Sequence, residues 1–165
     1  MAFLIDGFNL MYKFPDLEAL LYEDRLNEAR SGLLAILKRF SKIAGKPVSV
    51  VFDGKKEPSL TITRERFSSI DVFYSLDYSA DYLIKQFIKK DNNPRMTTVV
   101  TSDKDIIGFV TKFKAKVMKS EEFAEHVNRV FREWEESRVQ EKDPDPVLSD
   151  DEIGFWENMF RKKKK

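Results

Sequence analysis

The chain has 165 residues, of which 42% are hydrophobic, and its 29 basic side chains nearly balance 28 acidic ones, which gives a formal charge of +1. This length and hydrophobic content fit one domain with a single core. No apolar run approaches the ~20 residues that a membrane-spanning helix needs, so we expect no membrane span. The chain reaches Asp6 without a basic region or a long apolar stretch, so we expect no secretory signal and a cytoplasmic protein.

Apolar runs alternate with helical patterns along the chain, which predicts an α/β fold with a mostly parallel sheet of about five strands, covered by helices on both faces. A short apolar run predicts a buried strand over residues 3–5. Further strands are predicted over residues 48–52, 70–74 and 97–101, and a fifth, short one over 114–118. Helical spacing of apolar side chains predicts helices over residues 17–22, 24–44, 79–90, 104–113 and 120–139. Residues 55–66 show no period and are predicted to form a loop.

The end of the chain differs in composition from the rest. Residues 1–140 are predicted to form the folded domain, and 141–165 a proline-containing linker, a short amphipathic helix and a basic tail. Ser149 and Glu152 lie three apart before an apolar stripe, which is typical of a capping box at the start of a helix. This helix either packs back on the domain or docks on a partner.

The nearly neutral total conceals an uneven distribution of charge. Residues 85–119 hold nine basic side chains against three acidic ones, whereas 120–152 hold four basic against twelve acidic. A basic region beside a few isolated aspartates suits a phosphate-rich partner that is cleaved at an acidic centre. The alternative is an ordinary solvated surface.

The chemistry available to this chain is narrow. It has no cysteine, which excludes disulfides, thiol nucleophiles and thiolate–zinc sites, and its single histidine excludes a pair of histidines as acid and base. Aspartates follow the predicted strands or begin the helices after them, namely Asp6, Asp53, Asp81, Asp103 and Asp105. In a parallel sheet these positions share one edge, where the carboxylates would repel one another unless cations hold them. Oxygen ligands alone favour Mg²⁺ or Mn²⁺.

Several of these residues also have a purely structural interpretation. Asp81 and Asp105 lie in first helical turns, where the helix dipole favours a carboxylate, and Asp53 before a glycine fits an ordinary turn. Thr101 and Ser102 either orient a water or a phosphate or cap the following helix, and Ser102 with Asp105 fits a capping box.

Four motifs occur in order at the strand ends: residues 4–9 (LIDGFN), 50–54 (VVFDG), 79–84 (SAD with Ile84) and 99–105 (VVTSDKD). Together they resemble the NYN domain, a branch of the PIN-like nucleases, and specifically its YacP-like bacterial group. The resemblance covers about residues 2–130.

The resemblance implies a PIN-like three-layer α/β/α sandwich and a metal-dependent endoribonuclease. Asn9 is the neighbour of the first acid in the motif, and Asp53 matches the family's aspartate after the second strand. YacP-like proteins commonly carry another residue at the position of Asp105. Some members resemble ribosome-associated nucleases of mRNA decay, which makes the ribosome a candidate partner. The acids that match the family's catalytic and metal-binding positions are Asp6, Asp81, Asp103 and Asp105.

The predicted mechanism is hydrolysis of RNA, single-stranded or messenger, by a water activated by one or two Mg²⁺ or Mn²⁺ ions. Tyr12, Phe14 and Tyr78 lie near the predicted edge and either stack on unpaired bases or pack in the core. Basic residues expected to bind the RNA backbone are Arg64, Arg66, Lys85, Lys89 and Lys104.

Two alternatives remain open on the sequence. The same fold could bind RNA or a ribosomal surface with little or no cleavage. It could also be a phosphoacceptor receiver domain with Asp53 as the acceptor. A receiver needs an acid pair after the first strand, where Asp6 is followed by Gly7, and a lysine after the fifth, where Lys119 is a loose match.

Overall fold

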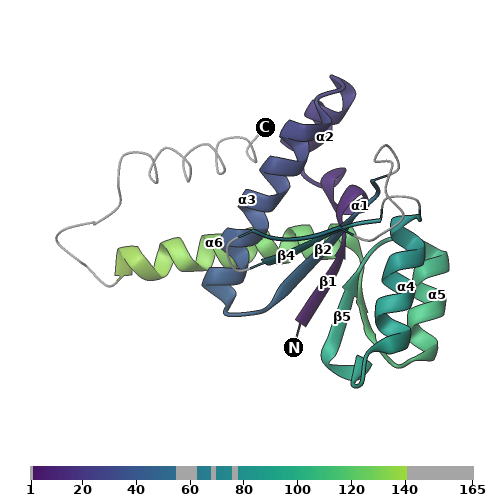
Figure 1. Cartoon of the computed structure of the whole chain (residues 1–165). Coiled ribbons are helices and arrows are strands. Elements are labelled where there is room, and N and C mark those ends of the chain that lie inside the picture. The colour runs from purple at the N-terminus through teal and green to yellow at the C-terminus, as the bar shows by residue number, and fades with distance from the viewer. Residues whose placement is uncertain (1, 55–62, 68–69, 76–77, 141–165) are drawn as a thin grey trace.

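The computed structural model describes residues 2–54, 63–67, 70–75 and 78–140 (Figure 1). The predicted linker, helix and basic tail after residue 140 lie outside the described residues, as does most of the predicted loop. In chain order the elements are β1 (Ala2–Asp6), α1 (Gly7–Met11), α2 (Pro15–Tyr22), α3 (Leu26–Ala44), β2 (Val48–Phe52), β3 (Thr63–Phe67), β4 (Ile70–Tyr74), α4 (Ala80–Lys90), the 3-10 turn η1 (Pro94–Met96), β5 (Thr97–Val100), α5 (Lys104–Lys112), β6 (Lys116–Met118) and α6 (Ser120–Gln140).

The sheet has six strands in the order β3-β4-β2-β1-β5-β6. Five of them run parallel, with Phe3 opposite Val48 on one side of β1 and Ile5 opposite Val100 on the other. β3 is antiparallel to β4 and forms one edge. The predicted α/β sandwich with a mostly parallel sheet is therefore confirmed, with one strand more than expected.

Two elements differ from the sequence prediction. Thr63–Phe67, predicted as part of a loop, forms β3, so the loop prediction is wrong for these residues. This strand carries three charged side chains in five positions, and an edge strand can be held by the backbone of its neighbour without an apolar pattern. The second is α1, which was not predicted because its five residues are too short to show a helical period.

Helices cover the sheet on both faces. Figure 1 shows α3 and α6 on one side and α4 and α5 on the other. Side chains of β1 alternate between the two layers: Phe3 and Ile5 pack with Phe40 of α3 and Phe123 of α6, whereas Leu4 packs in the cluster under α4 and α5. Asp6 follows Leu4 by two positions, so its side chain points toward the α4 and α5 layer.

The order of the parallel strands decides one of the open alternatives. Counted along the chain, the five parallel strands lie in the order 3-2-1-4-5. Receiver domains have the flavodoxin-like order 2-1-3-4-5, so the phosphoacceptor interpretation of Asp53 is wrong. The connection direction reverses between β1 and β5, and ligands of such sheets bind beyond the carboxyl ends of the strands at that point.

Among the described helices, α3 and α6 are the longest. α3 is amphipathic and ends at Gly45, which takes the left-handed conformation (φ 66°) that glycine tolerates, as predicted. α6 has charged side chains over most of its surface. Among the described helices, none is both long enough and apolar enough to cross a membrane.

Gly7, directly after Asp6, lies against the second strand without room for a side chain. A Cβ atom at this position would be 2.6 Å from two ring carbons of Phe52 and 3.0 Å from the carbonyl oxygen of Val51. We expect Gly7→Ala to lower the free energy of unfolding by about 1–3 kcal/mol, because the core must shift to admit the methyl group. Urea unfolding would measure the change.

Gly108→Ala is the matched control. Gly108 is exposed in α5, and a Cβ there would meet nothing within 4 Å. The same substitution should therefore stabilise the protein by about 0.5–1 kcal/mol through helix propensity alone. If both variants shifted stability in the same direction, the close packing at Gly7 would not determine the result.

Candidate active site

Asp6 is the last residue of β1, at the centre of the sheet. Only 9% of its surface is exposed. Ile5 pairs with Val100 in the sheet. Thr101, which follows Val100, therefore lies beside Asp6, which follows Ile5. The Thr101 hydroxyl accepts the backbone N–H of Asp103 at 3.1 Å and donates to Oδ2 of Asp6 at 3.1 Å. Thr101 therefore joins the two aspartates instead of capping the helix that follows.

The environment of Asp6 changes its acidity. Burial raises the pKa of Asp6 from 3.8 to about 6, because a carboxylate removed from water is harder to ionise. Hydrogen bonds from the Thr101 hydroxyl and the Asn9 backbone lower the pKa, whereas the negative charges of Asp103 and Asp81 raise it. The carboxylates of Asp81 in α4 and Asp103 at the start of α5 are thus close enough to Asp6 of β1 to disfavour its ionised form.

Asp103 has a second task as the N-cap of α5. Its Oδ1 accepts the backbone N–H groups of Asp105 at 2.8 Å and Ile106 at 3.4 Å. The expected capping box of Ser102 and Asp105 is wrong, because Asp103 itself caps the helix. This cap fixes the orientation of the Asp103 carboxyl group, and its Oδ2 accepts no hydrogen bond from the described part of the chain.

A lysine lies between the two remaining acids. Lys85 is one helical turn after Asp81 in α4, and its Nζ is 3.3 Å from Oδ1 of Asp81 and 2.5 Å from Oδ2 of Asp105. The hydrogen bond from Lys85 lowers the pKa of Asp105, and the same bond raises the pKa of Lys85. The structure therefore places Lys85 inside the acidic cluster, whereas the sequence suggested a contact with the RNA backbone.

Asn9 connects the loop between β5 and α5 to α6. Its Oδ1 accepts the backbone N–H of Ser102 at 2.9 Å and the hydroxyl of Ser120 at 2.6 Å. Ser102 Oγ donates to Oε2 of Glu121 at 2.6 Å and accepts the Ser120 N–H at 3.1 Å. These bonds fix the loop that carries Thr101 to α1 and α6.

Sequence reasoning missed Ser120 and Glu121. No spacing could have indicated them, because 111 positions separate Ser120 from Asn9.

Asp53 lies at the same edge in a different set of contacts. The buried Ser75 hydroxyl donates to Oδ1 of Asp53 at 3.5 Å and accepts the Gly54 N–H at 3.2 Å. These bonds hold the turn after β2, which agrees with the structural interpretation of this aspartate.

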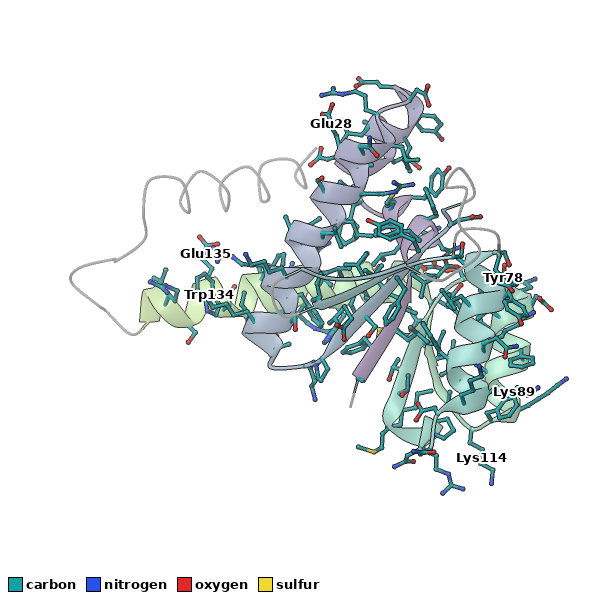
Figure 2. All side chains as sticks on the ribbon, in the orientation of Figure 1. Glu28, Tyr78, Lys89, Lys114, Trp134 and Glu135 are labelled. Carbon is teal, nitrogen blue, oxygen red and sulfur yellow. The ribbon has the colours of Figure 1, made fainter. Side chains whose placement is uncertain are left out.

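The other basic residues predicted to bind RNA lie in α4, α5 and β3. Lys89 and Lys104 are exposed and form no ion pair with the described residues. Figure 2 shows Lys89 farther along α4 from the carboxyl edge of the sheet than Tyr78. Arg64 and Arg66 lie in β3, opposite Phe73 and Asp71, and their side chains are outside what the structure describes.

The donors at this edge fit a hard divalent cation in chemical type. All are carboxylate oxygens, and Oδ1 of Asp81 is a buried oxygen with the Lys85 ammonium 3.3 Å away. The residues that the structure describes nevertheless hold no group of three or more acidic or histidine side chains placed to ligate one ion. Instead, the Lys85 ammonium provides positive charge to Asp81 and Asp105.

Comparison with known proteins agrees with this fold. Two crystal structures of Rae1 (YacP) from Bacillus subtilis superpose on the chain. One has a TM-score of 0.72 at 22% identity, covering all of this chain and 93% of that one. The other, of a mutant with leucine in place of a tryptophan, has a TM-score of 0.71 at 21% identity, covering 90% of this chain and 87% of that one. No curated protein matches.

A family model, described as the YacP-like NYN domain, matches residues 3–161. The match continues beyond the four motifs, into the segment after residue 140 for which the sequence suggested no family role. This family has a PIN-like nuclease fold. In the strand order of this chain, β1 lies at the centre of the sheet, with acids at its carboxyl end. The chain belongs to the YacP-like NYN domain family.

Proposed function

We propose that this protein is a metal-dependent endoribonuclease that hydrolyses RNA phosphodiester bonds. One observation carries the proposal: Asp6 is buried at the carboxyl end of the central strand, where burial raises its pKa to about 6 and the negative charges of Asp103 and Asp81 add to the rise. A buried carboxyl group beside like charges is unfavourable for folding, and a perturbed carboxyl group in a PIN-like nuclease fold is a candidate for binding a cation.

In this proposal Asp6, Asp81 and Asp103 would hold one or two Mg²⁺ or Mn²⁺ ions, with Asp105 as a further ligand. A bound cation would supply neutralisation of the phosphate charge and a lower pKa for a water molecule. The chain itself keeps the acids in position: Thr101 orients Asp6, and the cap of α5 orients Asp103.

Substrate binding follows from the surrounding charges. Lys89, Lys104, Arg64 and Arg66 would bind phosphates and fix the register of the RNA without reading its sequence. We propose a cytoplasmic role in mRNA decay, with the ribosome as a partner, on the basis of the family resemblance.

A cleavage assay tests the proposal. Unstructured RNA labelled at either end is incubated with the protein in Mn²⁺ or in EDTA. We expect cleavage only with Mn²⁺ and products with a 5′-phosphate and a 3′-hydroxyl, because the chain lacks the two histidines of a metal-free route. Binding without cleavage, on naked RNA and on translating ribosomes alike, would favour the alternative of an RNA- or ribosome-binding module.

Lys85 gives a prediction on the cation itself. In Lys85→Met the ammonium no longer neutralises Asp81 and Asp105, so the edge becomes more negative and Mn²⁺ should bind several-fold more tightly. Isothermal titration of metal-free protein with Mn²⁺ measures the affinity. Lys89→Met, on the same helix and without an ion pair to the described residues, is the control and should leave the affinity unchanged. Weaker binding in Lys85→Met would show that the lysine supports the site instead of competing for it.

A further inference from the structure

Two tyrosines form an exposed stack at the start of α4. The rings of Tyr78 and Tyr82 lie 5.0 Å apart between centroids with an angle of 18° between their planes. Each keeps nearly half of its surface exposed, 46% for Tyr78 and 45% for Tyr82. Core packing, one of the two interpretations of the aromatic residues, is correct for the buried Phe14 and wrong for Tyr78 and for Tyr12, which is 49% exposed.

This pair is fixed to the acidic edge by the backbone. Tyr82 follows Asp81 directly, and its N–H donates to the N-cap hydroxyl of Ser79 at 3.0 Å. The N–H of Tyr78 donates to the carbonyl of the buried Ser75, at the end of β4, also at 3.0 Å. Figure 2 shows Tyr78 at the end of α4 nearest the carboxyl edge of the sheet. The pair therefore lies at the end of α4 that carries Asp81 and is nearest the carboxyl edge of the sheet.

The ring geometry and the nearby charge indicate which kind of ligand the two tyrosines can bind. The two rings already lie nearly parallel, so a third flat ring can extend the stack on an uncovered face. Lys104, the first residue of α5, is exposed and provides positive charge for a phosphate chain at the end of that helix where Asp103 lies. A planar ring attached to a phosphate backbone is a nucleotide, and its base must be unpaired, because neighbouring base pairs cover both faces of a base in a duplex.

We propose that Tyr78 and Tyr82 form a stacking site for an unpaired nucleobase at the end of α4 that carries Asp81. This inference rests on the proposed nuclease function and adds to it a binding site for one base of the substrate. It differs from recognition of sequence, because every base offers a ring face.

Binding is measured by fluorescence anisotropy in EDTA, so that no RNA is cut, with a labelled unstructured 12-nucleotide RNA and with the same sequence in a duplex. We expect Tyr78→Ala and Tyr82→Ala each to weaken binding to the single strand about fivefold or more, and the phenylalanine variants to stay within about twofold of wild type, because a phenyl ring still stacks. Affinity for the duplex should not change in any variant. Tyr22→Ala is the control, since Tyr22 is 78% exposed on α2 and stacks on no ring of the described residues.

Two results would overturn the inference: unchanged single-strand affinity in both alanine variants, or an equal loss in Tyr22→Ala. Failure of the proposed hydrolysis looks different. A wild-type protein that binds single strands through the tyrosines and never cuts them with Mn²⁺ would retain the base site and remove the nuclease function. Circular dichroism melts of each variant show that a loss of affinity does not come from unfolding.

Discussion

Asp103→Asn should reduce RNA cleavage by more than about 100-fold while leaving the fold as stable as wild type. The substitution removes the negative charge on which a cation would depend. Asparagine and aspartate are nearly equal as N-caps, so the amide oxygen can still accept the N–H groups of Asp105 and Ile106. Cleavage rates on labelled RNA with Mn²⁺, together with urea unfolding, measure the two effects separately.

Asp103→Ala is the partner variant. It removes both the charge and the cap, so it should lose cleavage to the same extent and also about 1 kcal/mol of stability. Asp16→Asn, which removes an aspartate from the first turn of α2, should leave cleavage unchanged. Normal cleavage by Asp103→Asn would remove Asp103 from the proposed site and leave it only the role of capping α5.

Asp6→Asn should abolish cleavage and yet stabilise the metal-free protein at neutral pH. The folded pKa of Asp6 is about 6, above the ordinary 3.8, so the folded state binds the proton more tightly than the unfolded state does. Stability therefore falls as the pH rises from about 4 to 6, and at pH 7.5 the ionised carboxylate costs about 3 kcal/mol. Because an amide accepts fewer hydrogen bonds, we expect a gain of about 1–3 kcal/mol in Asp6→Asn.

Urea unfolding in EDTA at pH 7.5 and at pH 4 checks both the sign and the pH range. The stabilisation of Asp6→Asn should disappear at the lower pH, where the wild-type carboxyl group is protonated in the folded state. Adding Mn²⁺ at pH 7.5 should stabilise the wild type more than the variant, because a ligand that binds only the folded state shifts unfolding. A variant less stable than wild type at both pH values would contradict the buried, ionised Asp6 on which the proposal depends.

The sequence could predict the positions that depend on local pattern. Apolar residues place the strands β1 and β2, which end at Asp6 and directly before Asp53. Since parallel strands share a carboxyl edge, Asp6 and Asp103 could be assigned to that edge without coordinates. The same reasoning placed Asp53 there, but it could not show that Ser75 holds this aspartate in the turn.

Contacts between distant segments were beyond prediction. β3 has no apolar alternation because it is an edge strand, so nothing in its sequence indicates a strand. The bonds of Asn9 to Ser120 depend on how α1 and α6 meet in space. One signal was present and unused, since Lys85 follows Asp81 by the four positions that bring side chains together on a helix. The stack of Tyr78 and Tyr82 could not be predicted in this way, because Tyr78 precedes α4.

The hydrogen bonds of Asn9 limit how the domain can be shortened. If a fragment ended before α6, the Asn9 amide would lose the Ser120 hydroxyl, and Ser102 would lose both the Glu121 carboxylate and the Ser120 N–H. The backbone between β5 and α5 would then keep a single tether to α1. A fragment that keeps this loop in place must therefore extend through the beginning of α6, even though Asp6, Asp81 and Asp103 lie on other elements.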